Sequence, residues 1–144
     1  MTKAKSIIHQ ATCVAIGRRA VLIEGPPGIG KSSLALALID RGATLVGDDG
    51  VGLIMRDGTL WAEPPPGTAG LLEIRNLGLA QVQSCAAPVA LVLALDPAAP
   101  RFIEQAEQTE REGIALPLVR LWPESPVLAL RAEWALRLYG SDPG

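Results

Sequence analysis

Hydrophobic and polar positions form short runs along most of the chain, a pattern typical of β-strands. Two pairs of runs flank the turn residues Gly17-Arg18-Arg19 and Arg56-Asp57-Gly58, and each pair predicts a hairpin. The run 89–95 (VALVLAL) has no polar position, as expected for a strand buried on both faces. The expected strands are 14–16, 20–24, 44–48, 51–55, 59–62, 71–74, 89–95 and 116–121.

Helical composition occurs in fewer places. Residues 33–41 (SLALALIDR) are rich in strong helix formers and precede Gly42, a favourable residue for ending a helix. The polar segment 102–113 is also expected to be helical, whereas Pro64-Pro65-Pro66-Gly67 predicts an exposed loop.

A last helix is predicted near the end of the chain. Ser125 is a suitable N-cap with Pro126 in the first helical position, and Gly140 marks the end. Four apolar side chains recur at helical spacing on one face, which we expect to pack into the core. They are Val127, Leu130, Trp134 and Leu138.

Length and composition fit one domain over residues 1–144. The chain is 49% apolar and 19% charged, with a formal net charge of −2, and its Lys and Arg residues are scattered singly. Nucleic acid is therefore an unexpected partner, because a basic face is the usual footprint. We expect a single α/β domain with a mixed central sheet, one helix after residue 30 and a C-terminal helix.

Several features favour a soluble, cytoplasmic protein. The start MTKAKSIIHQ lacks the apolar core of a signal peptide. The longest apolar run is too short to span a bilayer, so no membrane partner is expected. Cys13 and Cys85 lie in apolar surroundings, and we expect two buried thiols in a reducing compartment.

A glycine-rich motif carries the strongest functional signal. Residues 25–32 read GPPGIGKS and match the P-loop pattern between a predicted strand and a predicted helix. Its glycines allow backbone amides to point at phosphate oxygens, and the helix start adds a positive dipole. Lys31 supplies a charge to the β- and γ-phosphates, and Ser32 is a Mg²⁺ ligand. The expected nucleotide-binding residues are Gly25, Pro26, Pro27, Gly28, Ile29, Gly30, Lys31 and Ser32.

Mg²⁺ also prefers carboxylates, and the sequence offers several. Asp48 and Asp49 follow a strand, and alternation would give them different tasks, one toward the metal and one toward the acceptor. Asp96 is expected in an ordinary turn but is the second candidate metal ligand. Glu73 lies in an apolar strand and would need a cation, either Mg²⁺ or Arg75.

Four blocks together resemble the catalytic domain of the bacterial HPr kinase/phosphorylase family. They are Ile8-His9, the P-loop with its helix, residues 45–49 (LVGDD) and residues 70–78 (GLLEIRNLG). The resemblance implies the HPr kinase and PEP carboxykinase-like fold in a short, proteobacterial form. It also implies ATP and Mg²⁺, phosphorylation of a serine of the phosphocarrier protein HPr, and a homo-oligomer, a hexamer in the family.

The resemblance further implies roles for individual residues. Ser32 and Glu73 would ligate Mg²⁺, with Asp48 a further candidate. Asp49 would accept the proton of the attacking serine, with His9 beside it, and Arg101 would correspond to a catalytic arginine.

Some positions depart from the family pattern and keep alternatives open. Ser33 replaces an acidic residue, Asn76 replaces a glycine, and residues 122–126 differ from a loop tied to dephosphorylation by inorganic phosphate with release of pyrophosphate. The kinase direction is therefore the safer expectation. A small-molecule kinase or NTPase using Asp96, or a non-catalytic ATP-binding regulator, would share the P-loop.

Overall fold

The computed structural model describes residues 5–143. It contains two helices, α1 (Lys31–Asp40) and α2 (Leu128–Tyr139). The strands of the first half are β1 (Ile7–His9), β2 (Thr12–Ile16), β3 (Arg19–Glu24), β4 (Thr44–Gly47), β5 (Val51–Arg56) and β6 (Thr59–Glu63). Those of the second half are β7 (Leu71–Ile74), β8 (Gly78–Gln81), β9 (Ala87–Leu95), β10 (Glu107–Arg111) and β11 (Ile114–Leu121).

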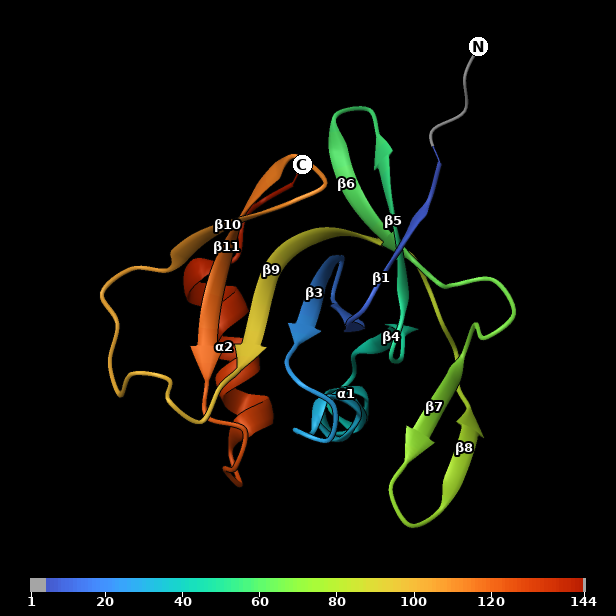
Figure 1. Cartoon of the computed structure of the whole chain (residues 1–144), viewed down its shortest axis with the longest axis horizontal. Helices are drawn as coiled ribbons and strands as arrows, with labels where there is room; N and C mark the ends of the chain where they lie inside the picture. Colours follow the sequence, from blue (N-terminus) through green and yellow to red (C-terminus); the bar gives the residue numbers. More distant parts are fainter. Residues whose placement is uncertain (1–4, 144) are drawn as a thin grey trace.

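The main sheet is mixed, as expected. Its strand order is β1-β5-β6-β9-β3-β2-β4, with β11 also paired to β9 and β10 to β11. Strands β3 and β11 both run parallel to β9, and the other pairings are antiparallel. The carboxyl ends of β3, β9 and β11 therefore meet at one edge, where α1 begins (Figure 1). Strands β7 and β8 form a separate hairpin.

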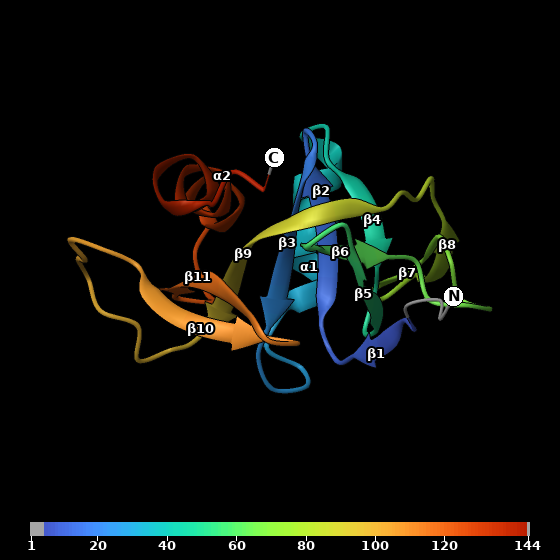
Figure 2. The ribbon, with the colours of Figure 1, turned by 90° about the horizontal axis from the view of Figure 1, so that it is seen from above.

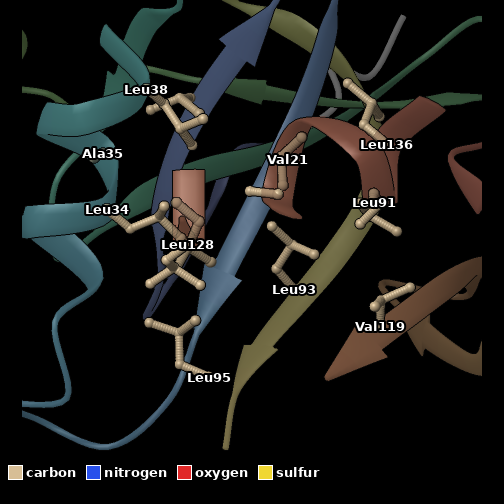
Figure 3. Close-up of a cluster of buried hydrophobic side chains, with 14 of the residues drawn as sticks. Val21, Leu34, Ala35, Leu38, Leu91, Leu93, Leu95, Val119, Leu128 and Leu136 are labelled. Carbon is tan, nitrogen blue, oxygen red and sulfur yellow. The ribbon is translucent and has the colours of Figure 1, made fainter. Parts of the chain in front are cut away.

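Both helices cover one face of the parallel strands, and Figure 3 shows their contact with that face. The side chains of β3 and β9 alternate between this cluster and a second one on the opposite face, where Leu22 and Val92 meet residues of β5 and β6. Because β9 is buried on both faces, it needs no polar alternation, which confirms the reading of residues 89–95. The first cluster includes Val21, Ile23, Leu34, Ala35, Leu38, Leu91, Leu93, Leu128, Ala132 and Leu136.

The prediction of which face of α2 packs into the core is wrong. Trp134 is 53% exposed and Leu138 65% exposed, and Val127 and Leu130 are also exposed. The helix instead buries a face with two alanines between two leucines, and these small side chains let its backbone approach the sheet. Arg137 lies over the ring of Trp134 at 4.4 Å. The buried residues are Leu128, Ala132, Ala135 and Leu136.

The start of α2 also differs from the prediction. The helix begins at Leu128, with Val127 rather than Ser125 at the N-cap position. The Ser125 hydroxyl accepts a hydrogen bond from the backbone N–H of Val127 at 3.1 Å. Ser125 therefore closes a turn ahead of the helix, a local use of a capping residue that the sequence pattern does not distinguish from a true N-cap.

The predicted helix over 102–113 is wrong. This part of the chain is a loop followed by β10, which pairs with β11 in a hairpin that turns at Glu112 and Gly113, both with positive φ. Strand β10 lies at the sheet edge, and its charged side chains suit that place because they discourage pairing with another chain. The proline loop is correct as a loop, but Pro65 within it is buried rather than exposed.

The two hairpins at residues 17–19 and 56–58 are confirmed. Cys13 and Cys85 are free thiols; Cys13 is buried and Cys85 half-buried, and burial raises the pKa of the Cys13 thiol. Within residues 5–143 no helix is both long enough and apolar enough to traverse a bilayer. Seen from above, α2 lies beside the end of the sheet that holds β9 and β11, and α1 lies behind β2 and β3 (Figure 2).

Candidate active site

The glycine-rich loop joins the carboxyl end of β3 to the first residue of α1. Gly28 and Gly30 have φ values of +81° and +114°, a left-handed backbone that favours glycine. The first turn of α1 directs its amides toward the loop, and Leu34 N–H bonds the Gly30 carbonyl at 3.0 Å. The Lys31 ammonium donates to the carbonyl of Gly25 at 2.6 Å. A helix start carrying a lysine is a site for an anion.

Asp48 is the centre of a hydrogen-bond network beside this loop. Its Oδ1 accepts bonds from the hydroxyls of Ser32 at 2.6 Å and Thr12 at 3.2 Å. Its Oδ2 accepts the backbone N–H of Glu73 at 2.9 Å. One carboxylate thus ties α1, β2 and β7 together. The role of Thr12 could not be predicted from local sequence, because its partner Asp48 lies 36 residues away in the chain.

The acidic pair lies in a tight turn rather than at alternating strand positions, since β4 already ends at Gly47. A Cβ on Gly47 would lie 2.2 Å from the carbonyl oxygen of Gly50, so only glycine fits here. Asp49 has a φ of +58° and is exposed, and its backbone N–H bonds the Thr12 hydroxyl at 3.4 Å. The turn therefore separates a bonded Asp48 from an exposed Asp49, although for a different reason than strand alternation.

The loop and the acidic pair line one cavity of about 170 Å³. Its basic groups come from α1 and from the turn that follows β7, and its carboxylates come from the Asp48-Asp49 turn and β7. The loop residues Pro26 and Ile29 and the first glycine, Gly25, are not among its lining residues. Those that line it are Thr12, Pro27, Gly28, Gly30, Lys31, Ser32, Ser33, Asp48, Asp49, Glu73 and Arg75.

The residues in this cavity fit Mg²⁺. Among residues 5–143 no group of three or more His, Cys, Asp and Glu side chains is arranged to hold a metal by itself. Mg²⁺ does not need such a cage, because it usually binds one or two carboxylates together with substrate phosphates and water. The Ser32 hydroxyl and Asp48, 2.6 Å apart, and the carboxylate of Glu73 offer hard oxygen ligands in one cavity.

The expectation that Glu73 needs a cation because it is buried in an apolar strand is wrong. Its side chain is exposed rather than buried in an apolar strand, because β7 belongs to a two-stranded hairpin away from the main sheet. The same hairpin brings Arg75 to the cavity. Burial therefore gives no argument for a metal at Glu73, and only its position beside Asp48 does.

His9 is held by an ion-pair cluster that sequence reasoning missed. Its Nε2 lies 2.6 Å from the carboxylate of Glu24, the residue directly before the loop. Arg111 of β10 donates two bonds to the same carboxylate, at 2.5 and 3.0 Å. Burial by itself would raise the pKa of Glu24, but the hydrogen bonds and charges of His9 and Arg111 lower it to about 2. The partners lie 15 and 87 residues apart in the chain, so no local pattern reveals them.

Asp96 and Arg101 lie outside the 170 Å³ cavity, as do His9 and the loop residues Gly25, Pro26 and Ile29. Asp96 forms the expected turn, since its Oδ1 accepts the backbone N–H of Ala98 at 2.8 Å, and its Oδ2 accepts from Arg120 at 3.3 Å. Arg101 is exposed in the connection between β9 and β10. The structure thus brings together Lys31, Ser32 and the acidic pair, but neither Asp96 nor Arg101.

A glycine loop after a parallel strand, with a lysine, a hydroxyl and an acidic pair around one cavity, places the chain in the class of α/β phosphate-loop proteins. Comparison with known proteins narrows the class. Residues 2–87 match the family described as HPr Serine kinase C-terminal domain. Because this match covers more than half of the chain, the chain belongs to that family.

Individual relatives agree with this assignment. The chain is 38% identical over 115 residues to HPr kinase/phosphorylase of Streptococcus thermophilus (strain ATCC BAA-491 / LMD-9), and 36% identical to that of Streptococcus pneumoniae (strain Hungary19A-6). Each match covers 70% of this chain and 37% of the relative. The chain thus spans little more than a third of these relatives' length.

A solved structure, the Hpr(Ser) kinase/phosphatase from Coxiella burnetii, matches more completely. The TM-score is 0.81 at 28% sequence identity, covering 91% of this chain and 88% of that one. This match confirms the expected fold, including the part of the chain beyond residue 87.

Proposed function

We propose that the chain is an ATP- and Mg²⁺-dependent kinase that phosphorylates a serine of the phosphocarrier protein HPr. The observation that supports this most is the shared cavity, in which Lys31 and Ser32 of α1 meet Asp48 and Asp49 of the turn. Phosphoryl transfer needs a phosphate cradle, a metal site and a group beside the acceptor hydroxyl. The cavity offers a residue for each need.

The residues divide the work as follows. Loop amides and Lys31 bind the β- and γ-phosphates, and Ser32, Asp48 and Glu73 hold Mg²⁺. When bound, the metal neutralises charge on the phosphates. The exposed Asp49 orients the serine hydroxyl and takes its proton as the serine oxygen bonds to the γ-phosphorus and ADP leaves. Asp49 joins the Asp48 network only through its backbone N–H, and its exposed side chain leaves the carboxylate available to a protein substrate.

His9 and Arg101 take supporting parts in this proposal. The Nε2 of His9 lies 2.6 Å from the carboxylate of Glu24. Strand β1, which contains His9, pairs with β5, and β5 begins just after the acidic turn. His9 thereby stabilises β1 next to that turn. Arg101 lies in an exposed loop and does not line the cavity. Arg75 already lines the cavity and is the better-placed cation for the transferring phosphate.

The direct test incubates the chain with Mg²⁺, ATP and HPr and analyses HPr by mass spectrometry. One phosphoserine per HPr is expected, and none when Lys31→Ala replaces the wild type. A second incubation with phospho-HPr and inorganic phosphate tests the phosphorylase direction, with pyrophosphate as the product. No phosphoserine from properly folded wild-type protein would contradict the proposal.

A further inference from the structure

The cavity that holds the phosphates is too small for a whole nucleotide. Its volume of about 170 Å³ is below the roughly 300–1,000 Å³ that ligand pockets usually offer. If the loop binds a nucleoside triphosphate, as proposed above, the base and ribose must therefore lie against a neighbouring surface.

Two neighbouring cavities share residues with the phosphate cavity. The first, about 530 Å³, contains Asp48, Asp49 and Glu73. These are the metal and acceptor groups, so the γ-phosphate points to this side and a nucleoside there would occupy the place of the acceptor. The second is a groove of about 220 Å³ that shares Gly30 and Ser33 instead.

This groove lies between the start of α1 and the connection from β11 to α2. Ala37 lines it from α1, and Pro123, Pro126 and Ala129 line it from the connection and α2. Its lining is mostly apolar, which suits a flat base better than a phosphate. The carboxyl ends of β3 and β11 lie at the same sheet edge, the usual place for ligands in α/β folds.

The order of phosphates along the loop leads to the same groove. In a P-loop the lysine reaches the β- and γ-phosphates, so the α-phosphate lies on the side away from the acceptor. Here that side is formed by Gly30 and Ser33, which are common to the phosphate cavity and the groove. We infer that the groove between Ala37 and Pro123–Ala129 holds the base and ribose of the nucleoside triphosphate.

Photolabelling can locate the base directly. Irradiation of the Mg²⁺ complex with 8-azido-ATP, followed by trypsin and mass spectrometry, is expected to label peptides 32–41 or 121–131, which contain the groove residues. Labelling of peptide 57–75 instead would put the base on the acceptor side and overturn the inference.

Affinity provides the second test, with the substitution Ala37→Trp. Ala37 is exposed on α1, so the larger side chain fills the groove without entering the core. Leu36→Trp is the matched control, since it adds the same side chain at the next, partly exposed position, which does not line the groove. Circular dichroism and urea unfolding check that both variants fold.

Calorimetric titration compares Mg-ATP with Mg-tripolyphosphate, which has no nucleoside. Ala37→Trp is expected to weaken ATP about tenfold, the effect of losing a small apolar contact, with tripolyphosphate unchanged. Leu36→Trp should alter neither. Unchanged ATP affinity in Ala37→Trp, or an equal loss for both ligands, would overturn the groove assignment alone. Failure of the wild type to bind either ligand would overturn the proposed function as well.

Discussion

Glu24 is the anchor on which the entrance to the phosphate loop depends, and its replacement by glutamine tests that role. The carboxylate accepts bonds from His9 and Arg111, and thereby joins β1, β3 and β10 directly before the loop. Its side chain is only 19% exposed. Glutamine keeps the shape of the side chain but removes the charge, so the variant isolates the ionic part of these contacts.

The loss of stability expected for Glu24→Gln can be worked out from the lowered pKa of Glu24. A fall from 4.5 to about 2 corresponds to an upper limit of about 3 kcal/mol, because one pKa unit is about 1.4 kcal/mol. Partial exposure and screening by solvent reduce this, and we expect Glu24→Gln to lower the free energy of unfolding by about 1–3 kcal/mol at pH 7.

The pH dependence gives the sharper test. Because folding lowers the pKa of Glu24, its contribution is complete above about pH 4.5 and is lost as the pH falls toward 2. Urea unfolding of wild type and Glu24→Gln at pH 7, 4, 3 and 2.5 should therefore show a difference that shrinks with acid.

A control separates this cluster from ordinary surface pairs. Glu107 also binds an arginine, Arg120, at 2.8 Å, but its side chain is 56% exposed. Glu107→Gln should cost less than about 1 kcal/mol. If Glu24→Gln cost no more than Glu107→Gln at pH 7, or lost the same free energy at pH 2.5 as at pH 7, the Glu24 carboxylate would not anchor the entrance to the loop.

Four further substitutions test other parts of the structure. Lys31→Ala should raise the Kd for Mg-ATP at least about tenfold in calorimetry while leaving the urea midpoint close to wild type. Gly47→Ala should cost about 1–3 kcal/mol in urea unfolding and reduce transfer, because its Cβ would collide with the Gly50 carbonyl at 2.2 Å. Leu93→Ala removes a fully buried side chain and should cost about 2–5 kcal/mol. Leu138 is 65% exposed, so in a monomer Leu138→Ser should change the free energy of unfolding by less than about 1 kcal/mol. Sedimentation of the variant and of wild type gives their oligomeric states and so tests the hexamer expected from the resemblance.

The parts of the fold that local sequence determines were predicted well. A hairpin turn such as Arg56-Asp57-Gly58 specifies its own pairing, and the loop motif specifies the strand before it and the helix after it. The strand over Ala87–Leu95 follows from its lack of polar positions. In each case the deciding residues are neighbours in the chain.

The errors concern features that distant residues decide. Helix α2 has two apolar faces, and the one that packs is selected by the shape of the sheet, which accepts Ala132 and Ala135 more closely than Trp134. The polar segment 107–111 has no apolar pattern of its own and becomes a strand because β11 offers it an edge. The structure of this segment therefore depends on its partner strand and not on its own sequence pattern.

In the candidate site too, local sequence indicates some residues, and the positions of others depend on distant parts of the chain. The motif alone located Lys31 and Ser32, and the resemblance indicated Asp49 and Glu73, which the fold brings to the same cavity. Thr12 and the Glu24–Arg111 pair could not be predicted, because their partners come from strands up to 87 residues away.

In the proposed function, Asp49 serves the transfer step and not the binding of the nucleotide. Asn also tolerates the φ of +58° found at this position, so Asp49→Asn should leave the turn intact. The most direct measurement determines, for wild type and Asp49→Asn, both the Kd for Mg-ATP and the rate of phosphoserine formation on HPr. We predict a Kd within about threefold of wild type and a rate lower by at least about a hundredfold. A variant that binds ATP and phosphorylates HPr at the wild-type rate would show that Asp49 is not the proton acceptor.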